Sequence, residues 1–378
     1  MIYLDYQATT PLAPEAREAM LPYLGDLFGN PHSPHRMGRE AAAAVEVARE
    51  RILVALTGGA PKDMAAGRLV FTSGATEALN WTIKGCFAKL GGARPRIVTI
   101  ATEHAAVLDS VRHLERLGAE VVVLPVDLHG QLDLDAARAA IDGRTALVVA
   151  MLVNNEIGVI HRIAEIGAHA RAVGAVMLCD AVQGFGRVKV PVESCDLIAM
   201  SAHKIHGPKG IGALWVREGF APEPLMHGGA QEGGLRSGTL SPALCAGFGV
   251  AADLARQRMV EDADHAYALF RRAREGLGEG WRLNGALARR WYGNLNVRAD
   301  GLDAGRLIAD LRGVALSAGS ACASGSGRPS HVLRAIGLSD AEARGSIRLG
   351  FGRYTTPDEI DRAMALVNEA VARQRMFA

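Results

Sequence analysis

Seven short apolar runs, rich in β-branched residues, recur through the first part of this chain. They are RLVF at 68, RIVTIA at 96, VVVLPV at 121, ALVVAMLV at 146, AVMLC at 175, LIAMS at 197 and ALWV at 213. Segments with helical spacing of apolar residues, such as ATEALNWTIKGCFAKL, lie between most of them. Strands without polar alternation are buried on both faces, and helices between them favour parallel pairing. The sequence therefore predicts an α/β fold with a mainly parallel, seven-stranded sheet.

The texture of the sequence changes near residue 258. A long Ala/Arg/Glu-rich segment, the short strand candidate NLNVRA and a closing helix follow, which is typical of an α+β unit. A chain of 378 residues is also long for one core. We therefore expect a large α/β domain at 14–257 and a smaller α+β domain formed by 1–13 and 258–378.

Composition excludes several classes of function. The net charge is only +2 and apolar residues make up 49% of the chain, so no nucleic-acid partner is implied. The N-terminus lacks a basic and then apolar leader, and no run of 18 apolar residues occurs. Five cysteines form no CxxC pair and no zinc spacing. We expect a soluble cytoplasmic protein with free thiols, no membrane segment and no intrinsic metal site.

Polar residues follow the apolar runs, at the edge where ligands bind in open α/β sheets. TSGATEALN opens a helix after RLVF, and its free amides together with the Thr76 hydroxyl form a candidate phosphate site. An ordinary capped helix is the alternative. DAVQGFG after AVMLC supplies Asp180 and Gln183, although an aspartate here can also simply cap a turn. NNEIG supplies Asn155 in a polar turn.

A lysine and a histidine complete this set. Lys204, in AHKIHGPKG, directly follows a buried strand, where desolvation disfavours its charge and makes a nucleophilic amine that can form a Schiff base. Lys209 lies past the turn and is expected to be exposed or structural. His104 ends another strand, where it acts either on a ligand or as a structural hydrogen-bonding group.

These residues together indicate a pyridoxal phosphate site. It needs a lysine for the Schiff base, an aspartate for the pyridine nitrogen, an anion cradle for the phosphate and a ring for the cofactor face. A nicotinamide cofactor is disfavoured because no GxGxxG sequence follows a strand and opens a helix.

Two further candidates lie downstream. Cys322 is surrounded by Gly, Ser and Ala in SAGSACASGSGRP, which predicts a loop with an accessible, nucleophilic thiol, whereas the other four cysteines are expected to fill the core. Arg348, in the strand-like SIRLGFG, is either a bidentate carboxylate clamp or an ordinary surface arginine.

The motifs, taken in order, resemble the NifS/IscS type of cysteine desulfurase. They are LDYQATTP, FGNPHSPHRMGRE, FTSGATEALN, TEHAAVLD, VNNEIGVI, DAVQGFG, SAHKIHGPKGIGALWVR, RSGT, SAGSACASGSGRPSHVLRAIG and SIRLGFGRYTT. The resemblance runs from residue 2 to about residue 370. It implies fold type I of the pyridoxal phosphate enzymes, a homodimer, and transfer of sulfur from L-cysteine, which becomes L-alanine, to a cysteine as persulfide.

The resemblance also implies roles, position by position. Lys204 would bind the cofactor covalently, Asp180 would pair with the pyridine nitrogen, and Cys322 would receive the sulfur. The remaining roles are His104 stacked on the ring, Gln183 at the ring hydroxyl, Ala75, Thr76, Ser201 and His203 at the phosphate, Thr239 at the partner subunit's phosphate, and Asn155 and Arg348 at the substrate carboxylate. The catalytic group is then Lys204, Cys322 and His104, and Cys322 would at most ligate a nascent cluster transiently.

The acceptor of the sulfur stays open. An iron–sulfur scaffold protein, nitrogenase assembly and tRNA thiolation all suit this enzyme type. Gln7 departs from the family pattern, which has Asn or Ser there, and little chain follows VARQRMFA to form the tail that longer relatives use for scaffold docking. The long cysteine loop favours the NifS/IscS group over the SufS group.

Two other functions remain as alternatives. One is a selenocysteine lyase or aminotransferase on the same scaffold, and the other is a non-catalytic pyridoxal phosphate-binding protein. Only persulfide chemistry requires Cys322, and a non-catalytic protein predicts losses among Lys204, Asp180 and His104, all of which are present.

Overall fold

The computed structural model describes residues 1–59, 66–318 and 329–376. In these ranges no helix is both long and apolar enough to cross a membrane.

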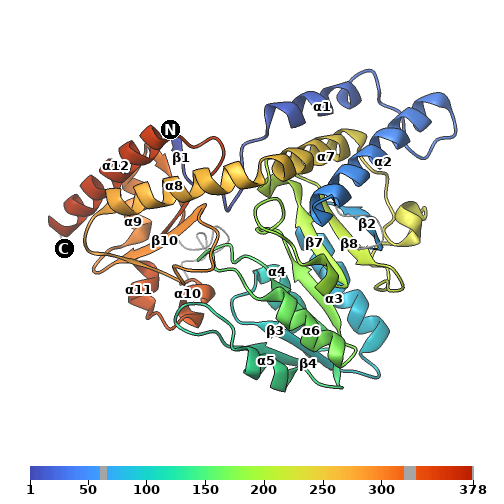
Figure 1. The fold of residues 1–378 in the computed structure, drawn as a ribbon, viewed down its shortest axis with the longest axis horizontal. Coiled ribbons are helices and arrows are strands. Elements are labelled where there is room, and N and C mark those ends of the chain that lie inside the picture. Colours follow the sequence, from blue (N-terminus) through green and yellow to red (C-terminus); the bar gives the residue numbers. More distant parts are fainter. Residues whose placement is uncertain (60–65, 319–328, 377–378) are drawn as a thin grey trace.

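A seven-stranded sheet forms the centre of the larger part of the molecule (Figure 1). Its strands are β2 (Gly67–Thr72), β3 (Arg96–Ile100), β4 (Glu120–Leu124), β5 (Thr145–Met151), β6 (Val176–Asp180), β7 (Leu197–Ser201) and β8 (Gly212–Arg217). Their order is β2-β8-β7-β6-β5-β3-β4, and only β8 runs antiparallel to its neighbours. The predicted strands and their mainly parallel pairing are confirmed.

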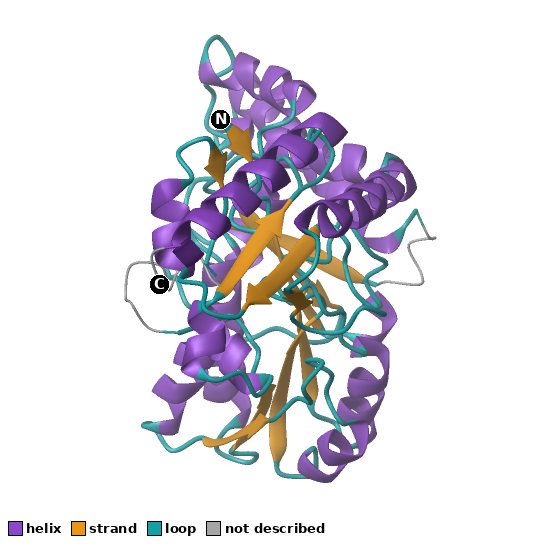
Figure 2. Ribbon diagram, turned by 90° about the vertical axis from the view of Figure 1, so that its left-hand side faces the viewer, coloured by secondary structure: helices purple, strands orange, loops and turns teal. Residues whose placement is uncertain are grey.

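Helices cover both faces of this sheet (Figures 1 and 2). They are α1 (Pro14–Leu24), α2 (Arg36–Thr57), α3 (Ala75–Leu90), α4 (Ala105–Glu115), α5 (Leu134–Ala140), α6 (Ile163–Ala172) and α7 (Pro242–Gln257). Successive strand residues alternate between two hydrophobic clusters: Leu69 and Phe71 of β2 enter one, and Val70 enters the other. Burial on both faces explains why these strands read as continuous apolar runs.

The last part of the chain packs around its own hydrophobic cluster. It contains α8 (Met259–Leu277), β9 (Trp281–Leu283), β10 (Asn294–Ala299), α9 (Ala304–Asp310), β11 (Val314–Ala315), α10 (His331–Ala335), α11 (Asp340–Arg344), β12 (Ser346–Gly350) and α12 (Pro357–Met376). Strand β10 lies between β9 and β12 in an antiparallel sheet. The N-terminal strand β1 (Ile2–Tyr3) pairs with β11, and Leu4 is buried in the same cluster. The division into domains at 14–257 and at 1–13 with 258–378 remains our proposal, which this separate cluster supports.

Four of the five cysteines lie within the described residues, and all four are buried. Cys86, Cys179 and Cys245 lie in a helix or strand, whereas Cys195 follows the short 3-10 helix η2 (Val192–Ser194). Burial raises the pKa of the Cys86 thiol, and it raises that of Cys245 to about 12. These thiols stay protonated near neutral pH, as core residues do.

His161 is buried without a hydrogen-bond partner for either ring nitrogen among the described residues. Desolvation lowers its pKa to about 4. The unfolded chain binds a proton at this side chain below the ordinary histidine pKa of about 6.5, but the folded chain does so only below about 4. The contribution of neutral His161 to stability is therefore complete above pH ~6.5 and is lost as the pH falls toward 4.

We predict that His161→Leu stabilises the protein in acid relative to neutral solution. Between pH 8 and pH 5, the free energy of unfolding of the variant should rise relative to wild type by about 2 kcal/mol, measured by denaturant titration at both pH values. Any change in packing caused by the leucine is the same at both pH values and cancels in this comparison. His129→Leu, at an exposed turn, is the control and should show no such pH-dependent difference. Parallel pH profiles for wild type and His161→Leu would contradict the prediction.

Candidate active site

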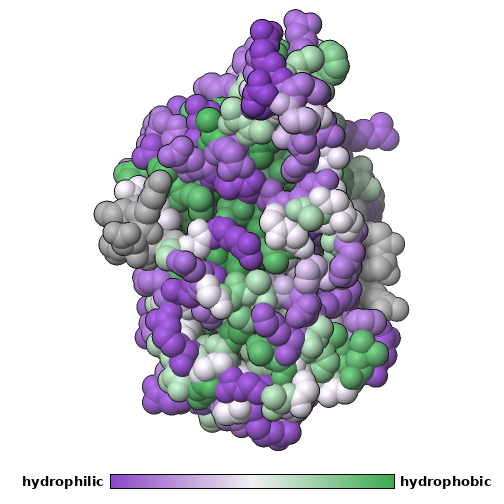
Figure 3. Space-filling model, turned by 90° about the vertical axis from the view of Figure 1, so that its right-hand side faces the viewer, coloured by the Kyte–Doolittle hydropathy of each residue, from purple (hydrophilic) through white to green (hydrophobic). Residues whose placement is uncertain are grey.

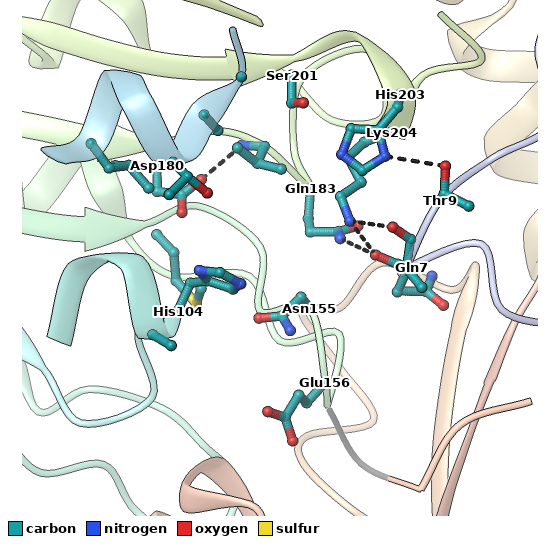
Figure 4. Close-up of a pocket in the computed structure, with 18 of the residues that line it drawn as sticks. Gln7, Thr9, His104, Asn155, Glu156, Asp180, Gln183, Ser201, His203 and Lys204 are labelled. Carbon is teal, nitrogen blue, oxygen red and sulfur yellow. Dashed lines mark hydrogen bonds between the residues drawn. The ribbon is translucent and has the colours of Figure 1, made fainter. Parts of the chain in front are cut away.

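A cavity of about 840 Å³ lies where the carboxyl ends of the parallel strands meet segments 7–9 and 329–331 and Arg348. Its lining contains most of the predicted site residues: Ala75, Thr76, His104, Asn155, Asp180, Gln183, Ser201, His203, Lys204 and Arg348. Figure 4 shows many of these side chains around one space. Their positions in the sequence span more than 270 residues, and the strand ends bring them together.

The start of α3 forms one end of the cavity. Its N-cap is Gly74, which offers no side chain, so no side-chain cap bonds the first-turn amides. Ala75 and Thr76 follow, and Ser201 and His203 line the same cavity. Strand β8 approaches very closely here, because a Cβ on Gly212 would lie 2.7 Å from the Gly74 Cα. The prediction of an ordinary side-chain-capped helix is wrong at this position, and the open amides suit a phosphate.

Asp180 ends β6 and faces the cavity (Figure 4). One carboxylate oxygen, Oδ1, accepts a hydrogen bond from the Val182 amide at 2.9 Å, so the residue also shapes the turn. Burial raises its pKa, while the backbone hydrogen bond and nearby His104 and Lys204 act in the opposite direction. A cationic ligand atom beside this carboxylate would favour its ionised form.

His104 is a structural hydrogen-bonding residue that also lines the cavity. It is the N-cap of α4, where its Nδ1 accepts a hydrogen bond from the Ala106 amide at 3.1 Å. Desolvation lowers its pKa, so the ring is neutral near pH 7. With Nδ1 accepting, the proton of the neutral ring lies on Nε2, and the imidazole still lines the cavity.

Lys204 lies in the short helix η3 (Ala202–Lys204) directly after β7. Its Nζ donates to the backbone carbonyls of Gln7 and Ala8, each at 2.7 Å. The neighbouring His203 contacts Thr9 Oγ1 through Nδ1 at 3.1 Å, and burial lowers the pKa of His203 to about 4. Lys209 is exposed, as expected, at the rim of the same cavity.

The unusual Gln7 does not remove any of these contacts. Its side-chain Nε2 donates to the Gly293 carbonyl at 2.8 Å, and its own backbone carbonyl accepts from Lys204. The same carbonyl accepts from Gln183 Nε2 at 2.9 Å. Gln7 therefore serves the site through its backbone, whatever its side chain.

Arg187 lies outside the cavity lining but supports two residues that line it, a role that the sequence analysis did not identify. Its guanidinium donates to the Lys204 carbonyl at 2.6 Å and to both the backbone and side-chain oxygens of Gln183. Desolvation lowers its pKa to about 10. Its place in DAVQGFGR, seven residues after Asp180, was the available signal, but its direction depends on the packing of the turn.

Arg348 is buried in β12, with 1% of its side chain exposed, so the surface alternative is wrong. Its Nη2 pairs with Asp5 Oδ1 at 2.8 Å, and Nη1 donates to the Asn155 carbonyl at 3.1 Å. Its Nε has no hydrogen-bond partner among the described residues. A cationic fork at the wall of the cavity suits an anionic ligand group.

Two predicted residues do not lie in the described cavity. Thr239 is exposed and is absent from the lining, and Cys322 lies outside the described residues. The described chain on either side of Cys322 is close to the site: Ser317 pairs with Arg348 in a β-bridge, and Pro329 lines the cavity.

These residues fit pyridoxal phosphate. The cavity combines an uncapped helix start, a buried aspartate, a lysine and an arginine, which match the phosphate, the pyridine nitrogen, the aldehyde and a substrate carboxylate.

Comparisons with known proteins agree with this fit. The family model for "Aminotransferase class-V" matches residues 2–363. The chain belongs to this family, among the NifS/IscS-type cysteine desulfurases. A curated "Cysteine desulfurase IscS" of Rickettsia bellii is 45% identical over 382 residues, which cover 99% of this chain and 92% of that protein.

Solved structures show the same fold. A "NIFS-LIKE PROTEIN" has a TM-score of 0.90 at 31% identity, covering 98% of this chain and 99% of that one. A structure titled "SspA in complex with cysteine" has a TM-score of 0.83 at 33% identity, covering 94% and 100%. The predicted family, type I fold and pyridoxal phosphate dependence are confirmed.

We predict that Arg187→Met weakens cofactor retention. Loss of the hydrogen bonds to Gln183 and Lys204 should speed release of pyridoxal phosphate roughly tenfold, followed by absorbance during dialysis against a scavenger. Arg217→Met is the matched control, because Arg217 also donates to backbone carbonyls, but at Cys195 and Glu193 and outside the cavity lining. It should lower stability and leave cofactor release unchanged. Equal release rates for Arg187→Met and wild type would contradict the prediction.

Proposed function

We propose that this protein converts L-cysteine to L-alanine and transfers the sulfur to Cys322 as a persulfide. The observation that carries the proposal is the meeting of Lys204, Asp180, the uncapped α3 start and Arg348 in one cavity. Membership of the cysteine desulfurase family supports it.

The chain's own residues would hold the cofactor in five places. Lys204 binds its aldehyde carbon, Asp180 keeps the pyridine nitrogen protonated, and His104 covers the ring face. Gln183 bonds the ring hydroxyl. The phosphate rests on the α3 start with Ala75, Thr76, Ser201 and His203. The bound cofactor stabilises negative charge at the substrate Cα, which no side chain alone can do.

Substrate binding and proton transfer follow from the same geometry. Arg348 and Asn155, which line the same cavity as Lys204, would hold the substrate carboxylate. Once the substrate amine holds the bound cofactor, Lys204 would be free as a neutral amine and would remove the Cα proton. Lys204 Nζ donates hydrogen bonds to the Gln7 and Ala8 carbonyls. These carbonyls would stabilise the ammonium group after it has taken up the proton.

Cys322 then completes the reaction. Its thiolate attacks the substrate sulfur, an S–S bond forms and the substrate C–S bond breaks. The electron pair of the broken bond stays with the three-carbon product, which takes up a proton and leaves as alanine.

We also propose a homodimer that works in the cytoplasm with an iron–sulfur scaffold protein or another sulfur acceptor. Exposed Thr239 supports the dimer, because it does not line the cavity of its own chain. Leu24, the last residue of α1, and Phe28, which follows it, are 68% and 74% exposed and supply apolar surface for association. General iron–sulfur assembly, nitrogenase assembly and tRNA thiolation remain the candidate pathways.

The deciding measurement is intact-mass analysis after brief exposure to L-cysteine, together with alanine release. Wild type should gain one sulfur, whereas Cys322→Ser and Lys204→Ala should gain none and should lose nearly all alanine release. Lys204→Ala separates covalent cofactor chemistry from simple thiol oxidation. Alanine release without any added sulfur, or full alanine release by Cys322→Ser, would overturn the proposal in favour of a lyase that discards the sulfur.

A further inference from the structure

The segment 227–241, here called the Thr239 loop, has a conformation that must be held from outside. Ala230 and Glu232 adopt left-handed backbone angles, with φ of 57° and 51°, although neither is glycine. Such residues cost free energy and persist only where surrounding contacts determine them. Despite its glycines, the loop also buries Leu235, Ser237 and Leu240.

Glu232 fixes the loop to the edge of the large sheet. Its carboxylate, with 3% of the side chain exposed, pairs with Arg49 Nη1 and Nη2 at 2.9 and 2.8 Å. Its Oε2 also accepts a hydrogen bond from the Phe71 amide at 2.8 Å. Phe71 lies in β2, the edge strand, so the carboxylate takes the position of the missing neighbouring strand.

Arg236 fixes the loop a second time, next to the predicted phosphate site. Its Nε and Nη2 donate to the two carboxylate oxygens of Glu77 at 2.7 and 3.1 Å. Glu77 lies in the first turn of α3 and also accepts from the Ser73 amide at 2.7 Å. The loop is therefore bound to the same helix start that is expected to hold the phosphate of its own subunit.

Gln231 closes the loop on itself just before Thr239, because its Oε1 accepts from the Gly238 amide at 2.8 Å. Thr239 itself remains exposed. In Figure 1 the yellow part of the chain that contains the loop lies at the far side of the large sheet from the last part of the chain. Figure 3 faces that side, where hydrophobic residues reach the surface among hydrophilic ones.

We propose that Glu232 and Arg236 are positioning residues for the active site of a second copy of this chain. They set the Thr239 loop in advance, so that Thr239 meets the partner's phosphate without a further ordering cost. This inference rests on the proposed dimer and cofactor site. It deepens them, because it assigns residues that lie outside the catalytic machinery of their own subunit to cofactor retention in the other.

Dimers of two different variants can show whether Glu232 affects the cofactor of the partner subunit or the cofactor of its own chain. In a dimer of a wild-type chain and a Lys204→Ala chain, only the wild-type chain binds the cofactor covalently, and its phosphate is met by the loop of the Lys204→Ala chain. Glu232→Gln is placed on either chain, and the release of covalently bound cofactor is timed by absorbance after addition of a scavenger. We expect roughly tenfold faster release when the change is on the Lys204→Ala chain, and little change when it is on the cofactor-bearing chain.

Three further variants test the mechanism. Thr239→Ala on the Lys204→Ala chain should speed release equally, and adding Glu232→Gln to it should add nothing, since both changes remove one contact. Arg236→Ala should behave like Glu232→Gln, with partial rescue by Arg236→Lys. Glu120→Gln is the matched control. Glu120 lies in β4, the edge strand opposite β2, and pairs with Arg96 at 2.6 Å, so the change also removes an ion pair at a sheet edge.

The possible outcomes distinguish failure of the positioning role from failure of the proposed dimer contact and of the proposed reaction. Additive effects of Glu232→Gln and Thr239→Ala, or a larger effect on the cofactor-bearing chain, would overturn the positioning role while leaving the desulfurase activity untouched. An inert Thr239→Ala would overturn both this role and the cross-subunit contact. Loss of the persulfide in wild type, by contrast, would identify failure of the proposed reaction itself.

Discussion

The contact of Lys204 with the segment 5–10 is the constraint on which the site depends. The lysine follows a strand of the large sheet, yet its ammonium group bonds the carbonyls of Gln7 and Ala8, which come from the N-terminus. The start of this segment also contacts the last part of the chain. Asp5 pairs with Arg348, and the Gly350 amide donates to the carbonyl of the preceding residue, Leu4. One N-terminal segment, which turns at residues 6–8, therefore connects the proposed catalytic base to the proposed carboxylate clamp.

Burial governs the electrostatics of the cavity. It raises the pKa of Asp180 and lowers those of His104 and His203, so each group is less charged than in water. A ligand with a cationic ring nitrogen would stabilise the charged form of Asp180. An anionic phosphate on the same ligand would accept hydrogen bonds from the open amides of α3. The protein is thus arranged for a zwitterionic cofactor, and each charge of that cofactor has a partner from a different strand end.

Much of the fold was predictable because its signals are local. The seven buried strands, the helix after TSG and the closing helix follow from apolar runs, spacing and glycine positions. The strand-end rule also brought Lys204, Asp180 and His104 to one cavity without any coordinates. Arg187, Asp5 and the Gln7 carbonyl were not predicted, since their roles are backbone or side-chain contacts between segments far apart in the sequence.

The sequence by itself determined the α/β class and the cofactor type, and it predicted which residues react, because residue chemistry and strand periodicity are properties of short stretches. Only the tertiary structure decided that Arg348 is buried rather than exposed, that His104 caps a helix through Nδ1, and that Thr239 is exposed and outside the lining of its own cavity. These depend on which distant segments pack against each residue. That packing follows from the burial of the whole core, which no local pattern records.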